Sequence, residues 1–585
     1  MPTGAYITFS ELFDSKASWE EIVDSVKGLP MHTAAMTLMR MNVVLRFALQ
    51  EHNRPNFGRL QQMMVNDFTD ADTFRRLQER FASTQTNQRP VFVPLAVLNV
   101  LRLVLVYARK DEPLSTLDDP ALRFSLGTAC LMMNNLLVSA EEERQIKEGD
   151  KDDRRLALLV QSLAPFELAF PPVDSHLLFR DGVIFRMLLN DTSVRARIAA
   201  ECRGFDFKVE FEALIGISLE RWLYVMFAIY SYYLQGGNAF DPHLEFSFLD
   251  PAVFAGQTQI TPAELGAVLS TVSGSMVELR QEVKRDLATD PRFDFVPFRT
   301  RPLVPVSANR LACIDLSFVL EKLHTGVHWT MHDSYGNRNT KRDDLFKAWG
   351  ILFEEYVHWL LSGMETKLAI KYFRPRWEEG GESFDGMLLQ GDVLVPLEYK
   401  GGFLARKARY SGNADEFIKD ADKKFGVGCR QLATKLNALF AQEQSQRKKM
   451  TDAPPIAHVR AVVPVLVLQD NILRVPFLNW YLNRRFQREL ACFSLQQGIV
   501  VRPLSVVNIF ELETMVNSSE ASEFDLVYGL HHRSVRDQEM LSELREFLSQ
   551  FPNYGRKQSD RWMKVYEELQ RSLFGYLFHE NAGSS

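Results

Sequence analysis

Cysteine is scarce in this sequence, and its few cysteines lie far apart. The 585 residues include five cysteines, and no two of them form a Cys-x-x-Cys pair. A disulfide framework or a zinc ribbon needs several cysteines at short, regular spacings. Their absence argues against both and is typical of a protein of the reducing cytoplasm.

Long apolar runs are also lacking. The best candidate for a membrane span, residues 91–108, is interrupted by Pro94, Asn99 and Arg102. A bilayer span needs about 20 consecutive apolar residues, so we expect a buried helix there instead. The first residues show no basic stretch followed by an apolar core, which is the pattern of a signal peptide. These absences predict a cytoplasmic protein without a membrane partner.

Neither sign of charge dominates the chain. The net charge of −6, with 24% charged and 46% hydrophobic residues, is ordinary for a globular protein. Binding of a nucleic acid would therefore need a local basic patch. An internal repeat, a Walker A loop and a dinucleotide fingerprint are absent from the sequence, which argues against repeat arrays and the common nucleotide-binding folds.

The chain is too long for one hydrophobic core, and about two to four domains are expected. Helical spacing of apolar residues fills the first half, with helix-start signals at Ser18 and at Thr261-Pro262. Short apolar runs and prolines replace this pattern near Asp290. We expect four consecutive regions, namely helical regions at 1–165 and 166–289, an α/β domain at 290–515 and a helical segment at 516–585.

The helical first half carries no recognisable chemistry. We expect it to be a helical module with a recognition or regulatory role, or a structural cover that packs over the second half of the chain. The histidines 324, 328 and 332 recur every four residues, a spacing that suits zinc on one helix face. The β-leaning residues 327–330 argue against a continuous helix there, so a metal site is disfavoured.

Residues 383–403 hold the most informative pattern. Two apolar runs, 387–389 and 393–395, flank Gln390-Gly391-Asp392, which predicts a β-hairpin with a two-residue loop. In that register Gln390 pairs with Val393. Pro396 lies in the second strand, where its missing N–H must face away from the ladder or cause a bulge.

The same register places two carboxylates opposite each other. Asp385 faces Glu398, and Lys400 projects from the same strand face as Glu398. Like charges on paired strands repel, so this arrangement is costly unless something binds between them. A divalent metal ion is the natural ligand, because hard cations take carboxylate oxygens.

Asp385 followed by Glu398-Tyr399-Lys400 resembles the Asp…(Asp/Glu)-x-Lys signature of the PD-(D/E)XK, or restriction-endonuclease-like, nuclease superfamily. The resemblance covers residues 342–468. Phe384 stands where the signature has proline, a departure that the superfamily tolerates. The resemblance implies an α/β core with a mixed central sheet, preceded by the large, mainly helical N-terminal region.

The resemblance also implies roles for the site residues. Asp385 and Glu398, with the backbone carbonyl of Tyr399, would hold one or two Mg²⁺ (or Mn²⁺) ions. Lys400 would orient or help deprotonate the attacking water, or stabilise the transition state.

A strong helix is expected over residues 343–361, just before the hairpin. Its Gly350-x-x-Phe353-Glu354-x-Tyr356 pattern looks like the first core helix of many superfamily members, which often lends a glutamate to the metal site. Glu354 is therefore a candidate catalytic residue and metal ligand, with Glu355 as the neighbouring alternative. A solvated glutamate pair on the helix edge is the simpler interpretation of either residue.

Basic residues gather after the hairpin. Between Lys400 and Met450 there are twelve Lys or Arg against five Asp or Glu, the local patch that phosphate binding needs. Gln431 matches a position where relatives often carry glutamine, whereas Lys435 replaces a tyrosine of one branch. The candidate nucleic-acid contacts are Gln431, Arg406, Lys407 and Arg409.

The sequence thus predicts a metal-dependent nuclease that hydrolyses phosphodiester bonds, with double-stranded DNA as the expected partner. The sequence does not decide whether the substrate is DNA or RNA, whether the enzyme is an endonuclease or an exonuclease, or what its oligomeric state is. A role in restriction, phage defence or repair is suggested only by analogy with the superfamily. Two other interpretations also stay open. The nuclease fold could serve only to bind nucleic acid, or the hairpin could be an accident in a helical scaffold or interaction protein.

Overall fold

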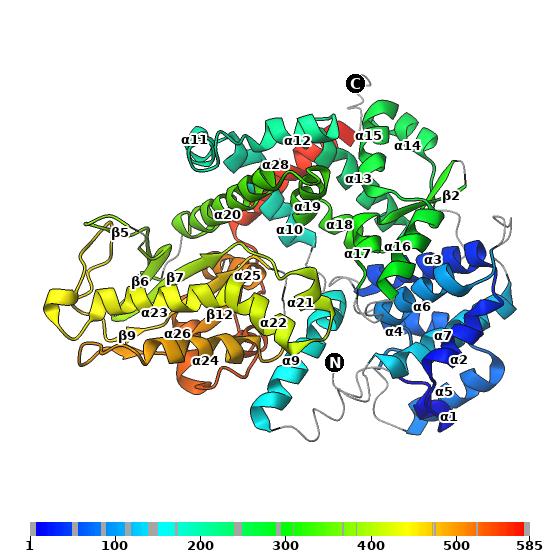
Figure 1. Cartoon of the computed structure of the whole chain (residues 1–585), viewed down its shortest axis with the longest axis horizontal. Helices are drawn as coiled ribbons and strands as arrows, with labels where there is room; N and C mark the ends of the chain where they lie inside the picture. The colour runs from blue at the N-terminus through cyan, green and yellow to red at the C-terminus, as the bar shows by residue number, and fades with distance from the viewer. Residues whose placement is uncertain are drawn as a thin grey trace. The chain divides into compact units, whose positions relative to one another are not determined.

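A computed structural model describes the chain except residues 1–6, 50–56, 84–88, 111–118, 138–149, 170–173, 239–247, 288–293, 308, 365–367, 382, 471, 473–474, 522–523 and 578–585. Its internal contacts divide the chain into two units (Figure 1). Unit 1 contains Met1–Glu143, Lys208–Gly336 and Gln570–Ser585, and unit 2 contains Arg144–Phe207 and Asn337–Leu569. This division crosses the four consecutive regions expected from the sequence, since each unit is built from separated stretches of chain.

Unit 1 is mainly helical. Its small sheet has the order β1-β3-β2, formed by Phe248–Leu249, Arg310–Cys313 and Leu303–Ser307. Its helices are α1 (Ser10–Phe13), α2 (Trp19–Lys27), α3 (Met31–Leu49), α4 (Phe57–Phe68), α5 (Ala71–Ser83), α6 (Pro94–Tyr107), α7 (Pro120–Leu136), α12 (Phe207–Ile215, which begins at the boundary), α13 (Leu219–Asn238), α14 (Pro251–Gln257), α15 (Pro262–Val272), α16 (Met276–Leu287), α17 (Val296–Thr300), α18 (Leu316–Glu321) and α19 (Thr325–Ser334).

The helix-start signals of unit 1 are confirmed. Ser18 caps α2 and Thr261 caps α15, each in a capping box with the glutamate three residues later. The apolar stretch expected to be a buried helix is α6, which is buried on nearly all sides. The β-leaning residues 327–330 lie inside α19, so the expectation of a break there was wrong. Tertiary packing of Val327 and Met331 in the core outweighs the weak strand preference.

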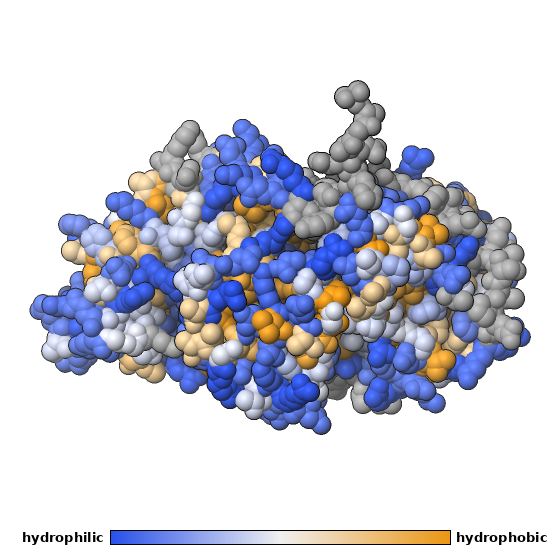
Figure 2. Space-filling model, turned by 90° about the horizontal axis from the view of Figure 1, so that it is seen from above, coloured by the Kyte–Doolittle hydropathy of each residue, from blue (hydrophilic) through white to orange (hydrophobic). Residues whose placement is uncertain are grey.

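No single helix of the described residues is long and apolar enough to cross a membrane, although the bent pair Phe207–Ile215 and Leu219–Gln235 passes that test together. On the face seen in Figure 2, orange hydrophobic residues lie in separate patches among blue hydrophilic ones.

A buried ion pair joins α3 to the start of α18. The Arg46 Nε atom lies 2.8 Å from Asp315 Oδ2, and neither side chain is more than 2% exposed. Asp315 also accepts a hydrogen bond from Asn42 and caps α18 through the Ser317 N–H.

Unit 2 is built on a mixed sheet. Strand β7 (Val393–Lys400) pairs antiparallel with β6 (Gly386–Gln390), which pairs with β4 (Lys371–Phe373). On its other side β7 pairs in parallel with β9 (Ala461–Val462) and β10 (Val465–Leu468), which continue to β11 (Val500–Val501) and β12 (Ser505–Asn508). A two-stranded sheet is formed by β5 (Arg376–Trp377) and β8 (Met450–Thr451).

The remaining elements of unit 2 are helices. They are α9 (Lys151–Ala169), α10 (Asp174–Asp181), η2 (Gly182–Met187), η3 (Leu188–Asn190), α11 (Thr192–Glu201), α20 (Asn339–Ser362), α21 (Arg406–Tyr410), α22 (Ala414–Ala421), η5 (Asp422–Gly426), α23 (Val427–Phe440), η6 (Gln444–Gln446), α24 (Leu478–Leu490), α25 (Ile509–Ala521), α26 (Leu526–Arg536), α27 (Leu544–Leu548) and α28 (Asp560–Leu577).

Helices pack against both faces of the sheet. Leu394, Leu466 and Val506 on one face share a core with residues of α23 and α24. Figure 1 shows α23 and α24 running beside the strands of this sheet. Tyr399 points to the other face, where it meets His358 of α20. Because successive side chains of a strand alternate between faces, β7 sends Glu398 and Lys400 toward α23.

The last strand of the sheet leads directly into a helix. Strand β12 ends at Asn508 and α25 begins at Ile509. The Asn508 side chain accepts from the Phe510 N–H, and Glu511 accepts from the Asn508 N–H. This local capping pattern starts a helix despite the β-branched residues before it.

We predict that Arg46→Leu lowers the free energy of unfolding by about 3–5 kcal/mol, because it leaves the Asp315 carboxylate buried without its cation. Urea denaturation measures the change. Arg75→Leu is the control, since the Arg75 side chain is 56% exposed in its ion pairs and such pairs contribute at most about 1 kcal/mol. Equal effects of the two substitutions would contradict this reasoning.

Candidate functional site

The hairpin register is the one that the sequence predicts. Gln390 pairs with Val393 and Gly386 pairs with Leu397, and Gly391 takes a positive φ of 58° in the loop. Pro396 faces Met387 without a bulge. On the other side of β7 the parallel ladder is interrupted between β9 and β10, so the missing N–H of Pro396 removes no ladder bond there.

Asp385 continues the hairpin by one residue. Its N–H donates to the Leu397 carbonyl at 3.1 Å, and its carboxylate accepts from the Tyr399 N–H at 2.6 Å. Asp385 therefore lies beside the Glu398–Tyr399 peptide, one residue beyond the last pair of the hairpin ladder. Burial and the neighbouring Glu398 carboxylate raise the pKa of Asp385 to about 7, against the opposing effect of Lys435 and Lys400.

Glu398 lies between two lysines. Its side chain is only 1% exposed, and its two carboxylate oxygens accept from Lys400 Nζ at 2.8 Å and Lys435 Nζ at 2.7 Å. Lys435 comes from α23 and is itself buried. A buried carboxylate needs such partners, because leaving it unpaired costs several kcal/mol, about 3–5.

Lys435 is the site residue whose role the sequence did not predict. Its spacing from Gly428 could have indicated that Lys435 faces the sheet, because residues seven apart lie on one face of a helix. A Cβ on Gly428 would lie 2.9 Å from Lys400 Cε and 2.6 Å from Leu466 Cδ1. The glycine thus lets α23 come close enough to place Lys435 beside Glu398.

These residues fit a magnesium ion in part. The N–H and carbonyl of one strand residue point to the same side, so the Tyr399 carbonyl faces the side of Asp385. Two carboxylates and a carbonyl are the oxygen donors that hard cations prefer. However, no group of three or more His, Cys, Asp or Glu able to hold a metal ion occurs among the described residues.

Glu354 of α20 is bonded to two arginines and a histidine rather than to the lysines that hold Glu398. Its carboxylate accepts from Arg197 at 2.7 Å, from Arg374 at 3.1 Å and pairs with His358 at 3.3 Å. Although burial opposes it, bonds from His358 and Arg197 lower the pKa of Glu354 to about 2. The neighbouring Glu355 pairs with the same two arginines.

Arg197 and Arg374, with the two glutamates that they bind, lie on the face of the sheet to which Tyr399 points. His358 contacts the Tyr372 hydroxyl, which lies 3.5 Å from the Tyr399 hydroxyl. Glu398 points to the opposite face from Glu354, whereas burial raises the pKa of Tyr399 and both Asp385 and Glu354 lie close enough to raise it further. Arg197 lies 157 residues before Glu354 in the chain. The sequence alone gives no signal that these two residues pair.

The four candidate nucleic-acid contacts differ in exposure. Arg406 and Lys407 of α21 are exposed, and Lys407 pairs with Glu416. Arg409 instead reaches inward to Glu167 and Asp470, and its side chain is 11% exposed. It is therefore an internal ion-pair partner rather than an exposed phosphate contact. Gln431 is half-buried one turn before Lys435 on α23.

The three spaced histidines form no metal group within the described part of unit 1. His328 is completely buried, and burial lowers its pKa to about 3.

No family model matches this chain, and neither a curated protein nor a solved structure matches it.

Asp385→Asn should stabilise the protein at alkaline pH. A carboxyl group with a raised pKa in the folded state binds more protons folded than unfolded, so the free energy of unfolding falls as pH rises from about 4 to about 7. Asparagine removes this loss and keeps an acceptor for the Tyr399 N–H. We expect the variant to be more stable by roughly 1–3 kcal/mol at pH 8, with a smaller difference at pH 4.5.

Chemical denaturation at both pH values measures this effect. Asp392→Asn is the control, since Asp392 is an exposed carboxylate of the same hairpin. A variant less stable than the original protein at pH 8 would show that ionised Asp385 stabilises the fold.

Proposed function

We propose that this chain is a metal-dependent nuclease of the PD-(D/E)XK type, with a restriction-endonuclease-like core in unit 2. The observation that carries the proposal is the hairpin register. Just beyond the paired residues, Asp385 accepts from the Tyr399 N–H, and Lys400 donates to Glu398 at the end of β7. This triad supports the resemblance seen in the sequence.

The surrounding sheet also supports the proposal. It is mixed, with the antiparallel strands β4, β6 and β7 followed by the parallel strands β10 and β12. A long helix precedes the hairpin, and α23 follows it to cover the face that carries Glu398.

Asp385 and Glu398, with the Tyr399 carbonyl, would hold Mg²⁺ or Mn²⁺. When bound, such an ion lowers the pKa of a water molecule and neutralises charge that develops on a phosphoryl oxygen. Without it, the carboxylates Asp385 and Glu398 face the ammonium groups Lys400 and Lys435. A bound cation would replace part of this lysine charge, and Lys400 would then be available to orient the water or the scissile phosphate.

Duplex DNA is the proposed substrate. The exposed Arg406 and Lys407 begin the helix that follows β7 by a short loop, and they would contact phosphates near the site. A role in restriction, phage defence or repair, in the cytoplasm, rests on analogy with the superfamily.

A second function is favoured by one observation. Glu354 is held by arginines, and both oxygens of Glu398 are held by lysines. An arrangement that satisfies these carboxylates internally suits a nuclease-fold protein that binds nucleic acid without cutting it.

Cleavage assays separate the two functions. Linear and circular duplex DNA would be incubated with Mg²⁺, Mn²⁺ or EDTA. We expect metal-dependent cutting that falls at least about 100-fold in Lys400→Ala and in Asp385→Ala, because each removes charge that acts on the transition state. Lys564→Ala, an exposed lysine of α28, should cut normally. DNA binding without cutting would support the second function, and retained cutting in both site variants would rule out the assigned residues.

The pH dependence tests Lys435. Its positive charge lowers the pKa of Asp385, so Lys435→Met should move the acid limb of the pH–rate profile to higher pH. A loss of about tenfold or more in rate near neutral pH should accompany this shift. Lys423→Met, at an exposed position just before α23, is the matched control. An unchanged profile in Lys435→Met would limit Lys435 to a structural role.

A further inference from the structure

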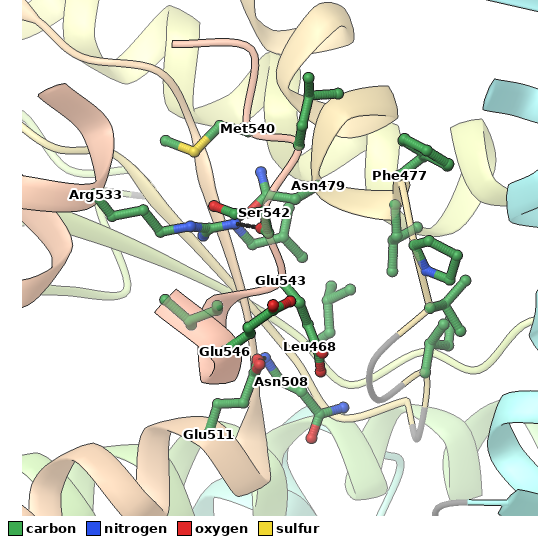
Figure 3. A pocket seen from close by; sticks show the side chains of 17 residues that line it. Leu468, Phe477, Asn479, Asn508, Glu511, Arg533, Met540, Ser542, Glu543 and Glu546 are labelled. Atoms are coloured by element: carbon green, nitrogen blue, oxygen red, sulfur yellow. Dashed lines mark hydrogen bonds between the residues drawn. The ribbon is translucent and has the colours of Figure 1, made fainter. Parts of the chain in front are cut away.

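A cavity of about 300 Å³ opens at the carboxyl ends of β10 and β12. Leu468 and Asn508, the last residues of these strands, lie in its wall with the start of α24, the end of α26 and the segment 540–546 (Figure 3). Crevices outside the carboxyl ends of parallel strands are the usual ligand sites of α/β sheets.

The cavity is lined by strained backbone. Phe477 and Met540 have φ angles of 64° and 54°, and both line the cavity. Large side chains rarely adopt this left-handed conformation, which costs about 1–3 kcal/mol at each position. Only three other non-glycine residues of the described chain do so. Strain of this kind is retained mainly where function requires it.

Two buried charges face the cavity without pairing. Arg533 is 1% exposed and Glu511 is 7% exposed, and no ion pair joins them within the described residues. Arg533 donates to Asn479 Oδ1 and to the Ser542 carbonyl, which leaves its buried Nε without a described partner. Glu511 accepts one hydrogen bond among the described residues, from the Asn508 N–H at 2.8 Å. Buried charges that are not paired are costly unless a ligand satisfies them.

The remaining polar groups set the charge of the cavity. Figure 3 shows the carboxylates of Glu511, Glu543 and Glu546 gathered on one side, with Arg533 entering from another. Asn479 and Asn508 are already engaged with backbone groups. The Glu543 and Glu546 carboxylates would repel a phosphate inside the cavity, whereas the oxygens of all three glutamates would accept hydrogen bonds from N–H groups.

We propose that this cavity binds a guanine base, with Glu511 accepting from its N–H donors and Arg533 donating to its oxygen or ring nitrogen. Guanine offers both donors and acceptors at its edges, and Arg to guanine O6 or N7 is the commonest specific contact of this kind. Thymine and uracil present mainly acceptors, which carboxylates disfavour. The apolar side chains of Phe477, Met540 and Val506 supply the surface on which a planar base packs.

The cavity lies beside the proposed catalytic site, and the inference therefore rests on the proposed nuclease function. Leu468 pairs with Lys400 on one side and with Asn508 on the other. Neighbouring strands are about 4.8 Å apart, so Lys400 and Asn508 are separated by roughly two strand spacings on the same face. One nucleotide spans such a distance, with its base in the cavity and its phosphate toward Lys400.

This geometry requires the base to leave the helical stack. Enzymes that hold a base in a closed pocket take it from single-stranded or locally opened nucleic acid. The substrate class is accordingly DNA in which a guanine next to the cleaved bond is unpaired or extruded.

Calorimetric titration of the full chain with deoxyguanosine monophosphate, in EDTA, tests the cavity apart from catalysis. We expect binding that is about tenfold or more tighter than for the adenosine and thymidine monophosphates. Glu511→Gln keeps the acceptor for the Asn508 N–H and should weaken guanine binding about tenfold. Glu378→Gln, at an exposed position away from the cavity, should bind normally.

The outcomes distinguish the two proposals. Guanine binding that Glu511→Gln weakens supports the cavity assignment even when no DNA is cut. Cutting of DNA without selective guanine binding, or equal binding by Glu511→Gln, overturns the assignment and leaves the nuclease proposal standing. Stabilisation by arginine or spermidine, with none by any nucleotide, also overturns it, because the cavity would then be a site for small cations.

Discussion

The electrostatic balance around Glu398 is the constraint on which the centre of unit 2 depends. A carboxylate that is 1% exposed must have partners, and they come from two elements, Lys400 of β7 and Lys435 of α23. For both lysines to reach it, α23 must approach the sheet closely, and Gly428 permits that approach. One buried charge thus determines how a helix packs on the sheet and where the polar groups of the candidate site lie.

The alternation of β7 divides the polar groups of unit 2 between two faces. Glu398 and Lys400 point toward α23, while Tyr399 points toward α20 and its arginine-bound Glu354. Asp385, just outside the strand, bonds the Tyr399 peptide and so stands at the edge between these environments. The pKa values express this division, since burial and the neighbouring Glu398 raise the pKa of Asp385, whereas His358 and Arg197 lower that of Glu354.

Unit 2 also keeps costly features at the carboxyl ends of its parallel strands. Arg533 and Glu511, which form no ion pair with each other among the described residues, and the left-handed Phe477 and Met540 all border one cavity. Folding alone favours a tightly packed apolar core at such a place. Their concentration at the carboxyl ends of β10 and β12, the strands next to the end of β7 that carries Lys400, is the physical reason to treat the two sites as one substrate surface.

The sequence by itself determined the local features. The hairpin register follows from Gly391-Asp392 and the period-two pattern, and the caps of α2 and α15 follow from Ser18 and Thr261, because these signals act within a few residues. The tertiary structure alone decided the partners of each charge. Lys435 meets Glu398, Arg197 holds Glu354 and Arg409 turns inward to Asp470, since such long-range pairings depend on how helices pack and leave no periodic signal in the chain.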